Sequence, residues 1–300
     1  MATDATATIL TAEPDLRVPS TRRTMRIGRV VRQNPLGVFG IMVTLMMIVC
    51  AIFAPIIAPY DPQKVGVGPT SIGPTSDHLF GTDDLGRDMF SRVVYGARIS
   101  LTVGFTSVIF GTLVATMLGI FSGYVGGQLD NFIQRVVDTA IAFPALLLLL
   151  ILSAILGPSL RTLIIAVGIA IIPGVTRVVR GAVLSERNNQ YVEAARALGA
   201  STPRILFRHI APNIVALSII IMTNLLGAVI LAEAALSFLG LGIPSSVTWG
   251  QDVDFARDAY PINVSQAFFP GLAIALTVLG FNLLGDSLRD IFDPRLRGRL

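Results

Sequence analysis

Six stretches without a charged residue divide the chain into apolar segments. They run from Gln33 to Tyr60, Ile99 to Leu129, Thr139 to Leu160, Thr162 to Thr176, His209 to Ala232 and Ala259 to Gly285. A bilayer core needs roughly 20 apolar residues in a helix, because every backbone N–H and C=O must be paired within the segment. The pattern therefore predicts six transmembrane helices.

The third and fourth stretches have features that modify this picture. Arg161 and Arg177 flank the short fourth stretch and can snorkel toward the headgroups, so this helix is expected to extend over about 160–180. Pro144 and Pro173 interrupt the third and fourth spans, a break that lipid tolerates where neighbouring helices or water satisfy the freed carbonyls. Bends that serve packing are the simpler expectation, and kinks along a transport pathway are the alternative.

The composition agrees with a membrane protein and excludes several function classes. Hydrophobic residues make up 53% of the chain and charged residues only 14%, which is not typical of a soluble domain. One cysteine, Cys50, excludes an internal disulfide framework, and two histidines, His78 and His209, leave no basis for a metal centre or an enzyme active site. The only lysine, Lys64, ends no Gly-rich phosphate loop, so the chain is not expected to bind ATP itself.

The distribution of basic residues predicts an orientation. If the N-terminus is cytoplasmic, 17 of the 23 basic residues lie in cytoplasmic segments and 6 in outer segments. The positive-inside rule then places both termini in the cytoplasm. Residues 1–35 are expected to form a basic tail that begins disordered and becomes amphipathic at the membrane surface, and residues 36–58 an uncleaved first helix.

A long outer loop over about 59–98 contains a charged run after a Gly- and Pro-rich part, which predicts a cap or meandering loop rather than a helix pair. The run includes Asp83, Asp84, Gly86, Arg87 and Asp88. It lacks the alternate-oxygen spacing of a calcium loop, so a short amphipathic helix with Asp88 paired to Arg92 is the favoured interpretation. Its apolar side, on the membrane face or a partner, would comprise Leu85, Met89 and Phe90.

Two acidic residues lie inside predicted spans. Asp138 follows Arg135 by three residues and is expected to pair with it, and Glu233 lies near the outer end of the fifth span. Ionisable groups in a membrane are costly and are functional candidates by default. Because both lie near span ends, pairing and packing are the favoured interpretation, and lining or gating of a pathway is the alternative.

Small residues recur along the second span and predict close helix packing. They are Gly104, Ser107, Gly111, Thr112, Ala115 and Gly119. Packing within a bundle accounts for them without a pore.

The cytoplasmic segment between the fourth and fifth spans is too polar to cross a bilayer, yet it has helix signals. Asn188 or Asn189 can cap a helix that reaches Leu198, and Gly199 is a suitable left-handed stop. Two short helices at an angle are therefore expected on the cytoplasmic face.

The second of these helices begins at Ser201 or Thr202 as its cap, with Pro203 in its first turn. It is expected to run until Pro212, where the chain restarts into the fifth span.

The first of these helices has a surface suited to docking. Ala194 and Ala195 remove side-chain bulk from one face, which lets a partner backbone approach, while Glu193 and Arg196 offer charged contacts at the rim. Docking of a partner suits this surface better than catalysis. An ordinary interfacial hairpin that links two spans is the alternative.

These residues resemble a known family. Glu193-Ala194-Ala195, then Gly199, then Pro212 resemble the Glu-Ala-Ala loop of ABC-importer permease subunits. His209 and Ala211 depart from the general pattern, but His-Ile-x-Pro-Asn is similar to the peptide-importer branch. Other segments resemble the C-type permease of dipeptide, oligopeptide and nickel importers: Gly81–Arg92 with Gly96–Leu101, Glu233–Gly242 with Trp249-Gly250, and Gly285–Asp290 with Asp293-Pro294-Arg295.

The resemblance covers about residues 30–297 and implies an all-α polytopic membrane protein of the bacterial inner membrane. Its six transmembrane helices would include the type I ABC-importer (MetI-like) permease core. The expected organisation is a cytoplasmic tail over 1–35, a first helix and outer loop over 36–98, a five-helix core over 99–290 with a coupling loop at 181–212, and a cytoplasmic tail over 291–300.

The resemblance also implies partners. These are a second homologous permease, two ATPase subunits that bind ATP and Mg, an extracytoplasmic solute-binding protein that delivers short peptides, and the lipid bilayer, with no nucleic acid. The coupling loop would seat Glu193, Ala194, Ala195, Arg196, Gly199 and Pro212 on an ATPase subunit. Contact of the outer charged run with the binding protein is an alternative to simple packing of the cap.

Other functions remain open at this stage. Relatives in the same family carry nickel, glutathione or haem. A secondary transporter or channel would use Asp138 or Glu233 for protons or ions, but no inverted halves are visible in the six spans. A membrane scaffold that recruits a cytosolic partner through the same loop is a third possibility.

Overall fold

The computed structural model describes residues 34–244, 246–259 and 263–292. The chain divides into two units, Met1–Asn34 and Pro35–Leu300, and the helices below all belong to the second. The predictions made for the N-terminal tail and for the last eight residues lie outside the described residues. Within the described ranges, the regular structure is helical apart from one isolated bridge between Thr82 and Asp88.

Within the described ranges, five helices are long and apolar enough to cross a membrane. They are α2 (Pro35–Ile52), α4 (Met89–Val125), α7 (Leu160–Glu186), α10 (Ala211–Leu236) with its flanking turns, and α12 (Ser265–Phe292). Shorter elements are α3 (Ala54–Ile57), α5 (Gly127–Ile141), α6 (Ala145–Leu156), α8 (Gln190–Ala197), α9 (Thr202–Ile205), the π turns η1 (Leu206–Ile210) and η2 (Ser237–Leu241), and α11 (Trp249–Ala259).

The third predicted span is not one continuous helix. Helix α6 and the last three residues of α5 lie within it, and these two helices are bent by 93° at the break between them. Pro144 lies in the break, and a proline disfavours helical geometry in the residue before it, so the helix ends ahead of it. Helix α6 is about 18 Å long, which is too short to cross alone. The described chain therefore has five spans, or six if the bent pair counts as one.

The fourth span behaves differently, because Pro173 lies inside α7 and the helix continues through it. The second span also differs from the prediction, since α4 begins ten residues earlier, at Met89. Its 37 residues extend about 55 Å, well beyond a bilayer core of about 30 Å. One long helix therefore connects the outer loop with the opposite end of this unit.

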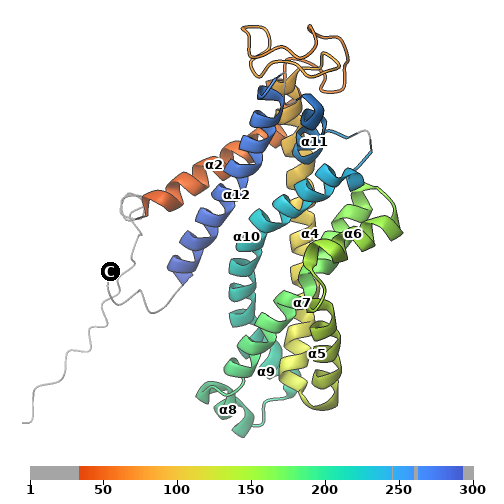
Figure 1. Cartoon of the computed structure of the whole chain (residues 1–300). Helices are drawn as coiled ribbons and strands as arrows, with labels where there is room; N and C mark the ends of the chain where they lie inside the picture. Colours follow the sequence, from red (N-terminus) through yellow and green to blue (C-terminus); the bar gives the residue numbers. More distant parts are fainter. Residues whose placement is uncertain (1–33, 245, 260–262, 293–300) are drawn as a thin grey trace, which may run out of the picture. The chain divides into compact units, whose positions relative to one another are not determined.

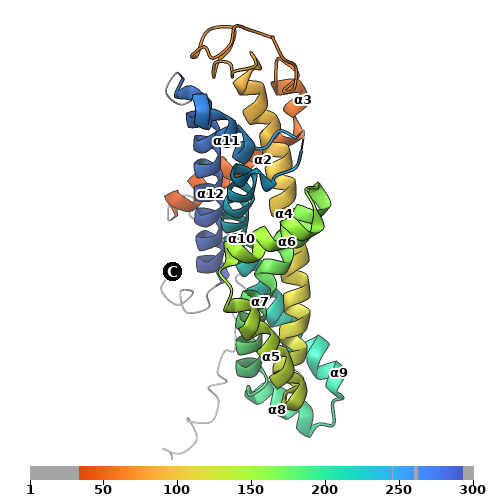
Figure 2. The same ribbon diagram turned by 45° about the vertical axis from the view of Figure 1, so that its right-hand side comes forward.

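Helix α4 lies at the centre of the unit and contacts α7, α10 and α2 (Figures 1 and 2). The small residues along α4 serve this packing, as predicted. A Cβ at Gly111 would lie 2.5 Å from the carbonyl oxygen of Gly168 in α7, and one at Gly119 would lie 2.7 Å from Cγ1 of Val179. Any larger side chain at either position would push α4 and α7 apart.

Two apolar clusters fill the interior. One gathers residues of α2, α4, α6, α7, α10, α11 and α12, and the other joins α4, α7 and α10 to α8 and α9. Both views place α11 and the loop after α3 at one end of the unit and α5, α8 and α9 at the other. Large apolar side chains stay exposed along α2, α4 and α6, as expected of a surface that faces lipid or other subunits.

Candidate functional site

Helix α8 carries the predicted docking surface and ends as the sequence indicates. Gly199 has φ of +79°, in the left-handed region. The Gly199 N–H donates to the Arg196 carbonyl, and the Ala200 N–H to the Ala195 carbonyl, each at 3.0 Å. These two bonds form a Schellman motif, which satisfies the last carbonyls of the helix. The predicted stop at Gly199 is confirmed.

The start of α8 differs from the prediction in one respect. Asn189 occupies the N-cap position, but its side chain makes no capping hydrogen bond. Its amide instead donates to Glu186 Oε2 at 3.1 Å. A carboxylate at the end of α7 competes for this amide, and the sequence alone cannot show that competition.

The outward face of α8 is open. Glu193, Ala194 and Arg196 are all exposed, and Ala195 is half-buried. Two apolar side chains near it are also open, with 89% of Leu198 and 70% of Phe207 accessible. The surface thus combines small, charged and protruding apolar groups, a mixture that suits contact with another protein.

The inward face of the same segment is buried. Val192 of α8 and Ile210 of η1 are fully buried, and both belong to the apolar cluster that contains Val179 and Val183 of α7. The side of α8 opposite its exposed face therefore packs against the transmembrane helices.

A polar cluster ties α8 to the ends of α7 and α10, and we call it the Glu186 node, made of Glu186, Asn189, Tyr191 and Asn213. The Tyr191 hydroxyl donates to Glu186 Oε1. Asn213 Nδ2 lies 2.6 Å from Glu186 Oε1 and 3.1 Å from Tyr191 Oη. Burial raises the pKa of the Tyr191 phenol, and the neighbouring Glu186 carboxylate acts in the same direction, so the phenol keeps its proton.

The chain does not restart at Pro212. Helix α9, the π turn η1, helix α10 and the π turn η2 follow one another without a gap over Thr202–Leu241. Ser201 is the N-cap of α9, without a capping side-chain bond. A proline lacks the N–H for an intrahelical bond, and the π turn just before Pro212 changes the bonding pattern where that donor is missing.

The outer charged run is a turn rather than a helix. The Asp83 carboxylate accepts from the backbone N–H groups of Leu85 and Arg87 at 3.0 and 2.9 Å, and from Arg87 Nε at 2.5 Å. Asp88 is the N-cap of α4, where it accepts from the Ser91 N–H at 2.8 Å and lies 2.9 Å from His78 Nδ1. Both carboxylates are used to fold the loop.

The predicted pairing of Asp88 with Arg92 is wrong. Arg92 is fully buried and its guanidinium bonds Asp252 of α11, with Nε at 2.8 Å from Oδ1, and the Pro62 carbonyl at 3.0 Å. Asp88 uses its carboxylate at the helix start, which leaves Arg92 free to reach a partner 160 residues away. The arginine therefore fastens α11 and the outer loop onto α4.

The rest of the outer run has mixed exposure. Asp84 is exposed and accepts from the Ser71 hydroxyl at 2.6 Å, and Arg87 stacks over the Phe255 ring of α11 at 5.5 Å. Gly86 has φ of +71° and its Cβ position lies 2.5 Å from the Gly68 carbonyl, so only glycine fits. Met89 is buried rather than on an open apolar face, whereas Leu85 is 49% exposed.

Glu233 is fully buried between α4 and the end of α10. It accepts from the Ser100 hydroxyl at 3.0 Å and from the Ser237 hydroxyl at 2.8 Å. Hydrogen bonds from two hydroxyl groups of the chain thus satisfy this buried carboxyl, and its role, structural or in the pathway, stays a prediction.

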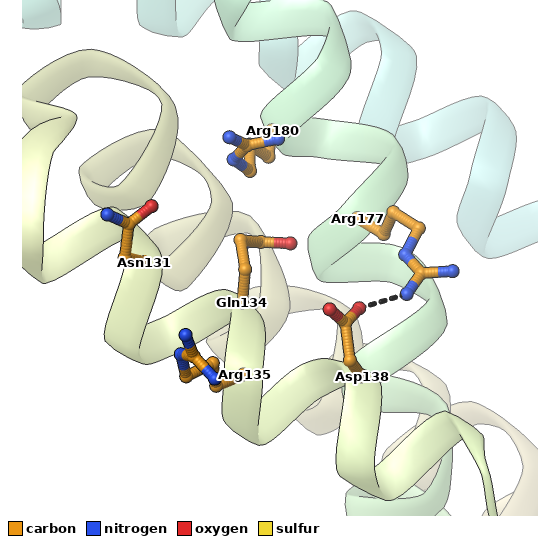
Figure 3. Close-up of a pocket in the computed structure, with 6 residues that line it drawn as sticks. All are labelled: Asn131, Gln134, Arg135, Asp138, Arg177 and Arg180. Atoms are coloured by element: carbon orange, nitrogen blue, oxygen red, sulfur yellow. Dashed lines mark hydrogen bonds and ion pairs between the residues drawn. The ribbon is translucent and has the colours of Figure 1, made fainter.

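Asp138 pairs with Arg177 of α7, and the predicted pairing with Arg135 is wrong. It lines an open cleft of about 590 Å³ between α5 and α7, whose lining residues are drawn in Figure 3. The cleft is lined by Asn131, Gln134, Arg135, Asp138, Arg177 and Arg180. A second pair, missed from the sequence, joins Arg180 to Asp130 through two bonds of 2.6 Å. No sequence spacing marks this pair, because the partners lie 50 residues apart.

Among the described residues, no three His, Cys, Asp or Glu side chains gather as metal ligands would. The candidate polar side chains described above lie in four places: the α8 surface with the Glu186 node, the outer loop, the buried Glu233 and the cleft between α5 and α7.

Comparison with family models gives two matches. Residues 115–298 match the binding-protein-dependent transport system inner membrane component. Residues 25–74 match the N-terminal transmembrane domain of oligopeptide transport permease C. Together the two models cover the first span and most of the remaining helices.

Several curated proteins resemble the chain along most of its length. The dipeptide transport system permease protein DppC of Alkalihalophilus pseudofirmus is 39% identical and covers 99% of this chain and 100% of its own length. The oligopeptide permease OppC of Bacillus subtilis is 40% identical over 89% of this chain and 88% of its own. The glutathione permease GsiD of Pectobacterium atrosepticum is 42% identical over 90% of each.

A solved structure, an inward-facing conformation of the MetNI methionine ABC transporter, shares the fold. The TM-score is 0.57 at 20% identity, over 68% of this chain and 98% of the matched chain. At this identity the likeness concerns the fold alone, and it confirms the all-helical permease architecture expected from the sequence.

Proposed function

The chain belongs to the family of binding-protein-dependent transport system inner membrane components, in its dipeptide and oligopeptide permease branch, and from this premise we propose that it carries short peptides across the inner membrane. It would form the translocation pathway with a second, homologous permease. Two ATPase subunits that bind ATP and Mg would supply the energy, and an extracytoplasmic solute-binding protein would deliver the solute.

The observation that best supports this proposal is the construction of α8. Its Glu193, Ala194 and Arg196 side chains are exposed, while Val192 beneath them is fully buried against α7. The Glu186 node adds hydrogen bonds to the ends of α7 and α10. A force applied to the open face of α8 would therefore move two transmembrane helices with it.

This geometry suits a lever that couples ATP hydrolysis to transport. Closure of the ATPase pair would displace α8, and α7 and α10 would follow because their ends are bonded to it. The pathway between the two permeases would then alternate between outward and inward access. The chain's own contribution is mechanical, so the chemistry of ATP hydrolysis would belong entirely to the partner subunits.

A transport assay in proteoliposomes tests the proposal. The chain is reconstituted with the second permease, the ATPase subunits and the binding protein, and uptake of a labelled dipeptide is followed with and without ATP. We expect uptake only with ATP. Uptake that persists without ATP would contradict the proposal and favour an ion-coupled carrier that uses Glu233 or Asp138.

Docking of α8 has its own test. Glu193→Ala should weaken capture of the ATPase subunits during purification and leave the permease in the membrane, because Glu193 is exposed and supports no buried contact. Asp84→Ala, an exposed acid in the outer loop, is the matched control and should leave capture unchanged. Full ATPase capture by the Glu193 variant would argue against docking through this face.

Glutathione is the second candidate solute, because the glutathione permease GsiD is as similar to this chain as the dipeptide permeases are. Competition separates the two solutes. Excess unlabelled glutathione should not reduce dipeptide uptake if the chain serves short peptides, and strong competition would instead assign it to glutathione.

A further inference from the structure

The cleft between α5 and α7 has no role in the lever described above. From its charge, its level and its apolar border we infer that it binds the phosphodiester headgroup of an anionic phospholipid, with the acyl chains lying along α5. The inference requires only that the chain is embedded in a membrane.

The charge of the cleft is the first argument. Three arginines, Arg135, Arg177 and Arg180, and one aspartate, Asp138, line the cleft, and Asp130 pairs with Arg180 at its edge without lining it. Each aspartate already binds one arginine of α7, and the guanidinium of Arg135 has no ion-pair or hydrogen-bond partner within the part of the chain described. An arginine presents a planar fork of donors that matches a phosphate, and the opening, about 590 Å³, is large enough to admit a headgroup.

The depth of the cleft relative to the membrane boundary is the second argument. The charge-free part of α7 ends at Thr176, and Arg177 and Arg180 follow directly. The first charges after an apolar stretch mark the boundary between hydrocarbon and headgroups. Basic pockets between transmembrane helices at such a boundary are known binding places for anionic headgroups.

The border of the cleft is the third argument. Leu129, Phe132 and Val136 of α5 are 46%, 67% and 55% exposed. Their spacing of three and four residues puts them on one stripe of the helix, and around the helix Arg135 lies between this stripe and the cleft residues Asn131, Gln134 and Asp138. A headgroup on Arg135 would therefore leave its acyl chains next to an apolar stripe, whereas a soluble anion would leave this stripe uncovered.

Lipid binding to the purified protein tests the inference. The full-length chain, with the subunits that accompany it, is stripped of lipid and titrated with phosphatidylglycerol or phosphatidylcholine of identical acyl chains, and bound lipid is counted by native mass spectrometry. We expect phosphatidylglycerol to bind several-fold more tightly. Equal affinity for the two lipids would overturn the inference without any variant.

Variants locate the site. Arg135→Gln should weaken phosphatidylglycerol binding roughly fivefold, which corresponds to about 1 kcal/mol for one basic residue near the surface. Arg135→Lys should lose less, because it keeps the charge. Arg161→Gln, an exposed arginine at the other end of α7, is the matched control and should bind as the unaltered chain does. Unchanged binding by Arg135→Gln would overturn the assignment to this cleft.

Soluble anions separate the possible sources of the ligand. Glycerol 3-phosphate carries the headgroup chemistry without acyl chains, and a dipeptide carries the carboxylate of the proposed solute. Neither should displace phosphatidylglycerol at equal concentration. Displacement by glycerol 3-phosphate would assign the cleft to a free phosphate, and displacement by the dipeptide would assign it to the transported solute, and either result would overturn the lipid inference.

Discussion

At the scale of single residues, the Tyr191 hydroxyl is a small group that joins three helices. Tyr191→Phe removes its hydrogen bonds with Glu186 and Asn213, each contributing about 1 kcal/mol, and preserves the ring. We expect the rate of transport in reconstituted liposomes to fall roughly fivefold for each kcal/mol of hydrogen bonding that is lost. ATPase capture should be retained, because the α8 surface is intact.

The control for this change is Tyr95→Phe, which removes a hydroxyl in α4 that makes no hydrogen bond within the described structure. It should transport at the unaltered rate. If Tyr191→Phe also transported at that rate, the hydroxyl of the Glu186 node would not contribute to coupling. Coupling would then depend on the apolar contacts of Val192.

The Arg92–Asp252 pair provides a prediction of stability. Asp252→Ala would leave a fully buried guanidinium without its carboxylate, and losing one partner of a buried pair typically costs about 3–5 kcal/mol. The melting temperature of the purified protein in detergent should fall markedly. Asp84→Ala, which removes an exposed carboxylate from the same outer region, should change it little.

A rescue experiment separates the pair from a simple loss of volume. Arg92→Leu combined with Asp252→Ala removes both charges, and this double variant should be more stable than Asp252→Ala alone. Equal melting temperatures would contradict the view that the unpaired guanidinium causes the loss.

The ion pairs show which side-chain contacts can be predicted from a sequence. Spacing indicates only pairs between residues three or four positions apart, so the sequence predicts Asp88 with Arg92 and Asp138 with Arg135. Both assignments are wrong because each arginine or aspartate finds a better partner on another helix, 160 residues away for Arg92 and 39 for Asp138. The residues were identifiable as important, but their partners depend on how the helices pack.

At the scale of elements, the end of α8 is controlled by Gly199. Gly199→Ala would place a Cβ at φ of +79°, where an L-residue costs about 1 kcal/mol or more. Nothing lies within 4 Å of that Cβ, so the cost is conformational rather than steric. The turn after α8 should become more sensitive to limited proteolysis, and ATPase capture should weaken.

Gly181→Ala is the matched control for this prediction. Gly181 lies inside α7, its Cβ position is also open, and alanine favours a helix over glycine. This variant should keep or slightly increase the melting temperature. Similar proteolysis of the two variants would show that the left-handed position is not what fixes the end of α8.

The elements themselves were predictable to different degrees. Gly199 is a local signal, so the end of α8 could be placed from the sequence to within one residue. A break was expected at both Pro144 and Pro173, but only Pro144 lies at one, the 93° bend between α5 and α6, because α7 continues through Pro173. Helix α11 was missed, although Thr248 and Gln251 have the spacing of a capping box and the Gln251 N–H bonds Thr248 Oγ1 at 3.3 Å.

At the scale of the whole molecule, apolar length and charge predicted the membrane spans well, because each is a property of one segment. The lateral order of the helices was out of reach. The small residues of α4 indicated close packing, but only the structure shows that Gly111 faces Gly168 of α7 and that Gly104 faces Ile230 of α10. Nothing in a single sequence pairs one stripe of small residues with its counterpart.

The orientation of the spans is the prediction that belongs to the molecule as a whole, and its single cysteine makes it testable. In a Cys50→Ser background, Leu198→Cys adds a thiol at an 89% exposed position beside α8, and Asp84→Cys adds one at an exposed position in the outer loop. The six spans predicted from the sequence assign 17 of the 23 basic residues to the same side as α8, so that side should face the cytoplasm. A membrane-impermeant maleimide should then label Asp84→Cys in intact cells and Leu198→Cys only in inverted vesicles. The reverse pattern would place α8 outside, where no ATPase could reach it, and the lever proposed for the Glu186 node would fail with it.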